Sequence, residues 1–308
     1  MKLSRRHLLA SSATLTAGAA LPLAPATADA APLIFVLIGD WGRKGHDDQT
    51  NVAVQMGKTA AAINSQFTIS LGDNFYENGV ESVTDPHWQK SFEQVYTAPS
   101  LQSPWKIMLG NHDYRGSIQA QFDYAKLSKR WQLPARYYQE TLALPDGGKA
   151  DVFYLDTSPF IKAYIGTRVD ITGQDTDAQL HWLDTALAAS TAPWKIVIGH
   201  HPIYTAVTGD EHDQPDLIAR LDPILRKHDI KIYINGHDHC FQVVKVNGLT
   251  YVTNGSGSET YDPGVAKRDG FASGAHGFMT MALTSQKLEF SLIDMTGKVL
   301  YQDTLTNT

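Results

Sequence analysis

The chain has 308 residues, of which 43% are hydrophobic, 10% aromatic and 19% charged. This composition is typical of a globular protein and excludes disordered and collagen-like chains. The formal net charge is −6, from 26 Lys and Arg against 32 Asp and Glu, which argues against a nucleic-acid-binding face. The single cysteine, Cys240, leaves no intrachain disulfide, and we expect it to be a small buried apolar residue.

Residues 1–30 predict a cleavable export signal. Two adjacent arginines precede a run of small apolar residues, and an A-x-A cleavage pattern ends at Ala30. The paired arginines resemble a twin-arginine signal, but Leu8 stands where that consensus has Phe, so the Sec route stays open. The alternative is a first helix of the folded domain, which Gly18, Pro22 and Pro25 disfavour.

The remaining residues, 31–308, are predicted to form an exported domain, periplasmic or secreted. No later stretch has about 18 uninterrupted apolar residues, so we expect no membrane span. The export machinery is then the partner that the signal implies. Removing the first thirty residues takes away three basic residues and one acidic residue, so the rest of the chain is more acidic still.

Short apolar runs alternate with helical segments along the chain. Buried strands are predicted over 33–38, 67–71, 105–109, 152–155, 194–198 and 230–234. Helices are predicted over 48–64, 86–95, 177–189 and 215–228. Consecutive strands follow over 250–253, 278–283, 288–293 and 299–302. The alternation predicts βα units with largely parallel strands, and since no linker divides the chain we expect one mixed α/β domain.

Five of these strands end in a glycine that precedes Asp, Asn or His. The segments are Gly39-Asp40-Trp41-Gly42, Gly72-Asp73-Asn74-Phe75-Tyr76, Gly110-Asn111-His112-Asp113, Gly199-His200-His201-Pro202 and Asn235-Gly236-His237-Asp238-His239. Parallel sheets place their sites at the carboxyl ends of the strands, and glycine permits the sharp turns that bring side chains together. One such segment alone is more often a simple turn. The set predicts a metal site with too many ligands for a single ion.

The order of these motifs resembles the calcineurin-like metallophosphoesterase superfamily. Most of that superfamily opens with D-x-H, whose histidine binds the first metal, whereas this chain has Gly42 at that position. Tyr76, three residues after Asp73, stands where the small purple acid phosphatases of the tartrate-resistant type have a replacement ligand. The resemblance extends from about Leu33 to Tyr301. It implies a four-layer α/β/β/α sandwich of two mixed sheets.

The resemblance also implies a ligand set for two metals. Asp40, Tyr76 and His239 would hold Fe(III), and Asp73 would bridge the two ions. Asn111, His200 and His237 would complete a site for a divalent metal, Fe, Zn or Mn. The donor chemistry agrees, because a phenolate with two carboxylates favours a trivalent ion and imidazoles with an amide oxygen suit a divalent one.

Four further residues match positions outside the metal ligands. In the family, the residue at the position of His112 contacts the substrate phosphate and protonates the leaving group, and Asp113 is its expected partner. His212, preceded by glutamate, fits the local pattern of a second outer histidine. His201 stands where mammalian members have tyrosine, so a phosphate contact and a supporting role both stay open.

The implied activity is that of an acid phosphatase that hydrolyses small phosphate monoesters with a metal-bound hydroxide as nucleophile. Two alternatives stay open. The first is a phosphodiesterase or nucleotidase on the same dimetal scaffold, because the substrate loops 204–214 and 255–271 cannot be interpreted from the sequence. The second is a non-catalytic scaffold protein, which the intact ligand set disfavours.

Overall fold

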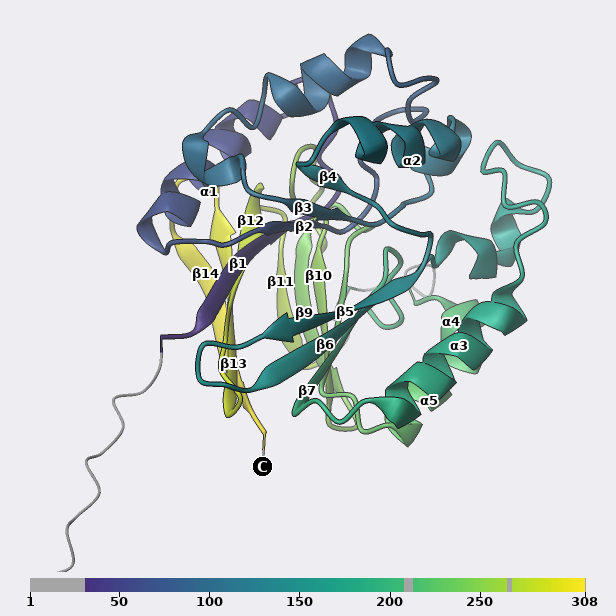
Figure 1. Ribbon diagram of the computed structural model, residues 1–308, viewed down its shortest axis with the longest axis vertical. Helices are drawn as coiled ribbons and strands as arrows, with labels where there is room; N and C mark the ends of the chain where they lie inside the picture. Colours follow the sequence, from purple (N-terminus) through teal and green to yellow (C-terminus); the bar gives the residue numbers. More distant parts are fainter. Residues whose placement is uncertain (1–30, 208–212, 265–267, 308) are drawn as a thin grey trace, which may run out of the picture.

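The computed structural model describes residues 31–207, 213–264 and 268–307, which form two seven-stranded sheets packed face to face (Figure 1). The strand order of the first sheet is β14-β13-β12-β1-β2-β3-β4. Strands β1 to β4 run parallel, and β12 to β14 continue the sheet antiparallel beyond β1. The bounds are β1 Leu33–Ile38, β2 Thr68–Ser70, β3 Trp105–Ile107, β4 Trp131–Gln132, β12 Gly277–Leu283, β13 Lys287–Asp294 and β14 Val299–Thr306.

The second sheet has the order β11-β9-β10-β8-β7-β6-β5. Its centre is parallel, from β6 through β7 and β8 to β10, and antiparallel strands flank it on both sides. The bounds are β5 Tyr138–Ala143, β6 Lys149–Tyr154, β7 Trp194–Ile198, β8 Ile232–Asn235, β9 Phe241–Val246, β10 Leu249–Asn254 and β11 Gly270–Ser273.

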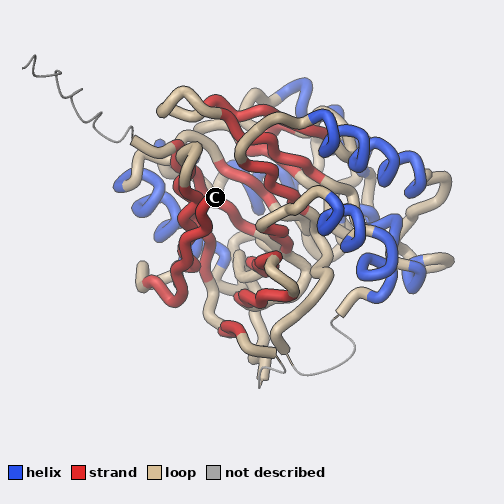
Figure 2. The backbone as a smooth tube through the Cα atoms, turned by 90° about the horizontal axis from the view of Figure 1, so that it is seen from below, coloured by secondary structure: helices blue, strands red, loops and turns tan. Residues whose placement is uncertain are grey.

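Helices cover the outer face of each sheet, so the layers run helix, sheet, sheet, helix (Figures 1 and 2). The first sheet carries α1 Gln49–Ala62, a π-helical turn Trp88–Glu93 and α2 Ile118–Leu127. The second carries α3 Thr176–Ala189, α4 Pro215–Arg220 and α5 Asp222–Lys227. Short 3₁₀ turns occupy Pro99–Leu101, Asp113–Arg115, Ser158–Phe160 and Lys162–Tyr164. The predicted four-layer sandwich of two mixed sheets is confirmed.

Strand β1 is apolar throughout because both of its faces are buried. In β1, Phe35 and Leu37 join the core between the sheets, whereas Val36 and Ile38 pack under α1. In β7, Ile196 likewise faces the other sheet. Side chains alternate between the two faces of a strand, so a strand with a core on each side favours apolar residues at successive positions.

The predicted strands all occur, with shifts of a few residues at their ends. The single helix predicted over 215–228 is wrong, because the chain forms α4 and α5 with a break at Leu221. Pro223 lies at the start of α5, where its missing N–H costs no helical hydrogen bond but would interrupt a continuous helix. The segment predicted as a helix over 86–95 forms the π-helical turn.

The predicted export signal lies outside the described residues. In the part of the chain that the structure describes, no helix is long and apolar enough to cross a membrane. Cys240 is buried as predicted.

Candidate metal centre

The predicted ligands gather where five parallel strands end. Loops after β1, β2 and β3 contribute from the first sheet, and loops after β7 and β8 contribute from the second. The seven residues that the sequence predicts as metal ligands are all part of this cluster: Asp40, Asp73, Tyr76, Asn111, His200, His237 and His239. Each sheet alone supplies only part of the set.

One group of donors surrounds the phenol oxygen of Tyr76. This oxygen lies 2.9 Å from Asp40 Oδ1, 3.0 Å from Asp73 Oδ2 and 2.9 Å from His239 Nε2. His239 Nε2 is also 3.6 Å from Asp40 Oδ1. Two carboxylates, a phenol and an imidazole therefore face one point, although the single phenolic proton can satisfy only one of them. A cation is the group that such a crowd of acceptors fits.

A second group surrounds the amide oxygen of Asn111. It lies 3.2 Å from His200 Nε2 and 3.0 Å from His237 Nδ1. His200 donates from Nδ1 to the Leu71 carbonyl at 2.8 Å, which fixes the ring orientation so that Nε2 faces the site. The structure thus presents an amide oxygen and two imidazoles at a second point.

Asp73 lies between the two groups. Its Oδ2 contacts the Tyr76 phenol, and its Oδ1 lies 3.4 Å from His200 Nε2. The same Oδ1 accepts a hydrogen bond from the backbone N–H of His112 at 2.7 Å. A carboxylate with one oxygen turned to each group has the geometry of a bridge.

The backbone at the cluster adopts uncommon conformations. Asp40, Asp73 and His237 have φ values of 60°, 50° and 70°, in the left-handed region that few residues other than glycine occupy. Gly110, in the loop after β3, has no room for a side chain, because a Cβ there would lie 2.2 Å from Asp73 Oδ1. Such local strain clusters at functional sites.

The backbone leaves no room for a side chain at Gly42 and ties this position to Tyr76. A Cβ at this position would lie 1.8 Å from the Asn74 carbonyl oxygen, so the backbone of the β2 loop fills the space of a side chain. The Tyr76 N–H donates to the Gly42 carbonyl at 2.9 Å and anchors that loop. The absent side chain at 42 and the phenol of Tyr76 are therefore parts of one arrangement.

The electrostatics of the cluster depend on its burial. Burial, with the nearby Asp73 charge, raises the pKa of Asp40 to about 8, despite the opposing effect of His200. Burial and the two carboxylates raise the pKa of the Tyr76 phenol well above its ordinary value. The phenol of the metal-free protein therefore keeps its proton, which a cation bound at this point would displace.

The imidazole of His112 stands beside the centre. Its Nδ1 donates to the Glu77 carbonyl at 2.7 Å, and its Nε2 lies 3.9 Å from Asp73 Oδ2. The ring lies 4.3 Å from the ring of Tyr76, measured between centroids. Its Nε2 thus faces the two groups of donors.

Asp113 does not partner His112 as expected. Its carboxylate accepts hydrogen bonds from the N–H groups of Asn74 and Gly110, at 3.1 and 2.8 Å, and from the Gln121 amide at 2.8 Å. The residue is fully buried and holds the β2 and β3 loops together. The two neighbouring side chains have separate partners, because His112 faces the Glu77 carbonyl and Asp113 faces the Gly110 N–H.

His201 forms hydrogen bonds with residues outside the seven predicted ligands. Its Nδ1 lies 2.8 Å from the Thr157 hydroxyl and its Nε2 2.8 Å from the Tyr164 hydroxyl, so both ring nitrogens have partners. Although an atom of His201 lies within 4.8 Å of atoms of His200 and His237, these two hydrogen bonds favour a supporting role. His212 lies outside the described residues.

Sequence reasoning missed Thr157. Its hydroxyl accepts from the backbone N–H groups of His200 and His201, at 3.1 and 3.0 Å, and also contacts the His201 ring. It follows β6, a strand end without a glycine motif, so no local signal marked it.

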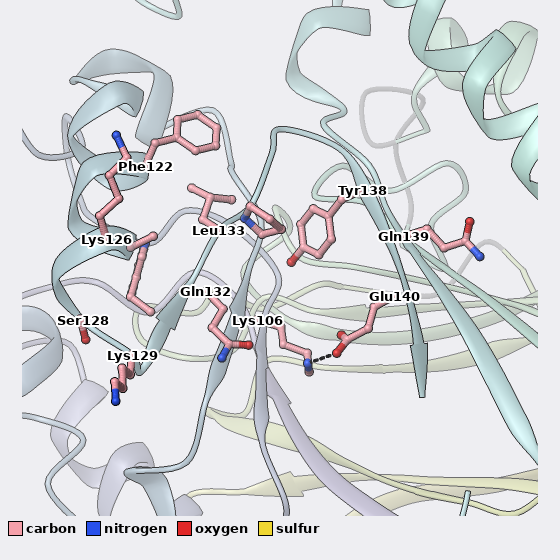
Figure 3. Close-up of a pocket in the computed structure, with 13 residues that line it drawn as sticks. Lys106, Phe122, Lys126, Ser128, Lys129, Gln132, Leu133, Tyr138, Gln139 and Glu140 are labelled. Carbon is pink, nitrogen blue, oxygen red and sulfur yellow. Dashed lines mark hydrogen bonds and ion pairs between the residues drawn. The ribbon is translucent and has the colours of Figure 1, made fainter. Parts of the chain in front are cut away.

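A cavity of about 780 Å³ lies elsewhere, between α2 and β5 (Figure 3). Phe122, Leu133 and Tyr138 line it, and Lys106 forms an ion pair with Glu140 there. None of the residues that line it belongs to the metal cluster. The cluster, with its convergent donors, remains the candidate site.

Residues 33–241 match the family described as calcineurin-like phosphoesterase. This match covers more than half of the chain and includes every predicted metal ligand. The fold and the cluster thus define the protein's class as a phosphoesterase of this type.

Similarity to curated relatives places the chain in one family among the calcineurin-like phosphoesterases. The chain is 38% identical to purple acid phosphatase 7 of Arabidopsis thaliana, over 89% of this chain and 86% of the relative. It is 32% identical to tartrate-resistant acid phosphatase type 5 of Oryctolagus cuniculus, over 89% and 90%. The chain therefore belongs to the purple acid phosphatase family of calcineurin-like phosphoesterases. The family implies a dimetal centre, and Asp40, Asp73 and His200 form a possible metal-binding group.

The fold also matches a solved protein described as GAP50, the anchor in the inner membrane complex of Plasmodium. The TM-score is 0.78 at 24% identity, over 90% of this chain and 89% of that one. The same fold is thus found in a protein described as an anchor and in phosphatases, so the function has to be argued from the site.

Proposed function

We propose that the protein is an acid phosphatase that hydrolyses small phosphate monoesters at a centre of two metal ions. The observation that carries the proposal is the convergence of Asp40, Asp73 and His239 on the Tyr76 phenol oxygen, at 2.9 to 3.0 Å. The one phenolic proton cannot satisfy all of the acceptors in this group, whereas a cation can. A second group of donors adjoins it.

The donor types suggest which ion each group would hold. Asp40, Tyr76 and His239 would hold Fe(III), because phenolate and carboxylate are hard anionic ligands. Asn111, His200 and His237 would hold a divalent ion, Fe, Zn or Mn, and Asp73 would bridge the two. When bound, two such ions supply positive charge for the phosphate and lower the pKa of coordinated water.

His112 is the proposed proton donor to the leaving oxygen. Its Nδ1 is held by the Glu77 carbonyl, so its Nε2 is the atom that faces the site and can carry the proton. Asp113 acts indirectly, because it fixes the backbone of the loop from which His112 projects. His201 keeps the β7 loop in place through Thr157.

Local charge lets an anionic substrate approach an acidic protein. One trivalent and one divalent ion outweigh the three anionic ligands Asp40, Asp73 and Tyr76, so the loaded centre stays positive. A field at this range governs substrate entry more than the formal net charge of −6 does.

A comparison of substrates tests the activity. The metal-loaded protein should hydrolyse p-nitrophenyl phosphate faster than bis(p-nitrophenyl) phosphate. A preference for the diester would support the phosphodiesterase alternative. No hydrolysis of either ester at any pH would support the scaffold alternative.

The Tyr76→Phe variant tests the proposed ligand. Tyrosinate bound to Fe(III) absorbs visible light, so the variant reconstituted with iron should lose the visible band of the wild type. Tyr261→Phe is the matched control, because this ring also lies beside His239, at 6.2 Å between centroids, and should leave the band in place. A band that persists in Tyr76→Phe would refute the ligand assignment.

The N-terminal segment would direct export by the twin-arginine route, with cleavage after Ala30. The support is the motif in residues 1–30. Mass spectrometry of the mature N-terminus, in bacterial hosts with and without the twin-arginine translocase, tests it. Export that continues without the translocase would favour the Sec route.

A further inference from the structure

Arg43 covers the outer face of the Tyr76 ring. Its guanidinium carbon lies 4.0 Å from the ring centroid, and its side chain is only 11% exposed. A planar cation at this distance from an aromatic face is attracted by the ring electrons, and the attraction is stronger where water is excluded.

Three carboxylates surround this guanidinium: Asp47 Oδ2 lies 4.0 Å from Arg43 Nε, and two others lie closer. Arg43 Nη1 lies 2.6 Å from Glu77 Oε1, in the loop after β2. Arg43 Nη2 lies 2.6 Å from Glu259 Oε2, in the segment after β10. Arg43 itself belongs to the loop after β1, so one side chain connects three loops around the phenol.

The connection reaches His112 through Glu77. The carbonyl of Glu77 accepts the hydrogen bond from His112 Nδ1, while its side chain pairs with Arg43. The position of Glu77 therefore affects both the ring of Tyr76, its chain neighbour, and the imidazole proposed as proton donor.

We propose that Arg43 is a positioning residue that fixes the Tyr76 phenol and, through Glu77, the His112 imidazole. It is not one of the proposed ligands, and it acts by lowering the energy of the ring electrons and by tying the three loops together. The electronic part of this inference rests on the proposed function, because it needs Tyr76 as a ligand. The mechanical part does not.

A lysine cannot replace this arginine. The guanidinium lies flat on the ring and offers a separate nitrogen to each carboxylate, whereas an ammonium is a single point charge. Arg43→Lys should therefore keep the charge but lose one of the two ion pairs with Glu77 and Glu259, and Arg43→Met should lose both ion pairs.

The visible spectrum of the iron-loaded protein tests the electronic part. Removing a cation from the ring raises the energy of the phenolate electrons, so the band of Arg43→Met should move to longer wavelength and that of Arg43→Lys should move less. Arg130→Met is the matched control, since Arg130 lies 4.1 Å above the ring of Phe92 and pairs with Glu93, outside the cluster. Its band should not move. An unchanged band in Arg43→Met would overturn the electronic part.

Amide hydrogen exchange of the metal-free protein tests the mechanical part. In Arg43→Met the amides of Tyr76, Gly79 and Tyr261 should exchange at least about fivefold faster than in the wild type, because the loops open more easily. Glu259→Gln should give a smaller increase, concentrated at Tyr261. Arg130→Met should leave these three amides unchanged. Equal exchange in Arg43→Met and the wild type would overturn the inference.

The two measurements separate this inference from the proposed function. A wild-type protein that binds iron without a visible band would refute the Fe(III)–Tyr76 assignment and the electronic part with it. Faster exchange in metal-free Arg43→Met would then still support Arg43 as the residue that ties the loops.

Discussion

Gly42 shows how one residue without a side chain shapes the centre. The Asn74 carbonyl occupies the place of its Cβ at 1.8 Å, and this approach lets the β2 loop carry Tyr76 into the cluster. Backbone atoms cannot rotate away as a side chain can, so the position tolerates no added methyl group.

Gly42→Ala should lower the free energy of unfolding by at least about 2 kcal/mol, because it overpacks a buried backbone contact. Gly147→Ala is the control: that glycine has φ +84° but nothing within 4 Å of an added Cβ, so only conformational strain of about 1 kcal/mol is expected. Urea denaturation measures both. Equal losses for the two variants would mean that the close approach to Asn74 carries no cost.

Asp156 is a buried carboxylate next to the cluster. The Tyr114 hydroxyl donates to its Oδ2, whereas its Oδ1 has no hydrogen-bond partner among the described residues. Burial raises the pKa of Asp156 to about 7. The folded state thus binds its proton more tightly than the unfolded state does, and the stability that this proton contributes is lost as the pH rises from about 4 to about 7.

Asp156→Asn should remove this pH dependence, because the amide cannot ionise. Relative to the wild type, the variant should become more stable as the pH rises through that window and level off above it. Urea denaturation of both proteins between pH 4 and 8 measures the difference. A difference that stays constant with pH would show that Asp156 ionises in the folded state as it does in the unfolded state.

Much of the site could be predicted at the scale of single residues. The motifs, with the family resemblance that they carry, predicted all seven residues of the cluster, because each one follows a recognisable strand. Thr157 and Arg43 were missed because their partners are distant in sequence: Arg43 pairs with Glu259, and Thr157 with His201. Asp113 was misjudged because adjacency along the chain does not fix the direction of a side chain.

At the scale of elements, the long apolar runs were predictable and the short or polar ones were not. Strand β4 has only two residues, too few for a pattern. Strand β9 begins two residues after His239, so its first residues were not separated from the metal motif in the sequence. Helix α2 was missed because its buried residues are few, Ala120 and Gln121. Periodicity detects an element only when it has enough buried positions to form a pattern.

Helix α3 depends on its N-cap. The Asp175 carboxylate accepts a hydrogen bond from the Ala178 N–H at 2.9 Å. Asp175→Ala should cost about 1 kcal/mol of the free energy of unfolding. Asp177→Ala, in the first turn and 91% exposed, should cost less than about 0.5 kcal/mol. Thermal denaturation compares the two, and equal costs would argue that the cap contributes nothing beyond surface charge.

At the scale of the whole molecule, each proposed ion would connect the two sheets. Asp40 and Tyr76 follow strands of the first sheet and His239 follows a strand of the second. Asn111 follows β3 of the first sheet, while His200 and His237 follow strands of the second. Ions held in this way would stabilise the packed sandwich in addition to any catalytic role.

Removal of the metals should therefore lower the melting temperature as well as abolish activity. A ligand that binds only the folded state at about a thousandfold its dissociation constant stabilises it by about 4 kcal/mol. Calorimetry before and after chelation measures the loss, and readdition of iron with a divalent metal should restore it. Chelated protein that is shown to be metal-free but melts at the original temperature would contradict this expectation.

Because the two sheets share the proposed ligands, folding of both sheets is expected to precede metal binding. Neither sheet alone presents a complete set of donors, so a partly folded chain with one sheet formed has no site to load. Strand β12, near the end of the chain, pairs with β1 near its start, so the first sheet is complete only when the whole chain is available. Metal uptake is therefore expected to come late in maturation, after the two sheets have packed against each other. A protein with bound metal would then be one in which both sheets have already formed.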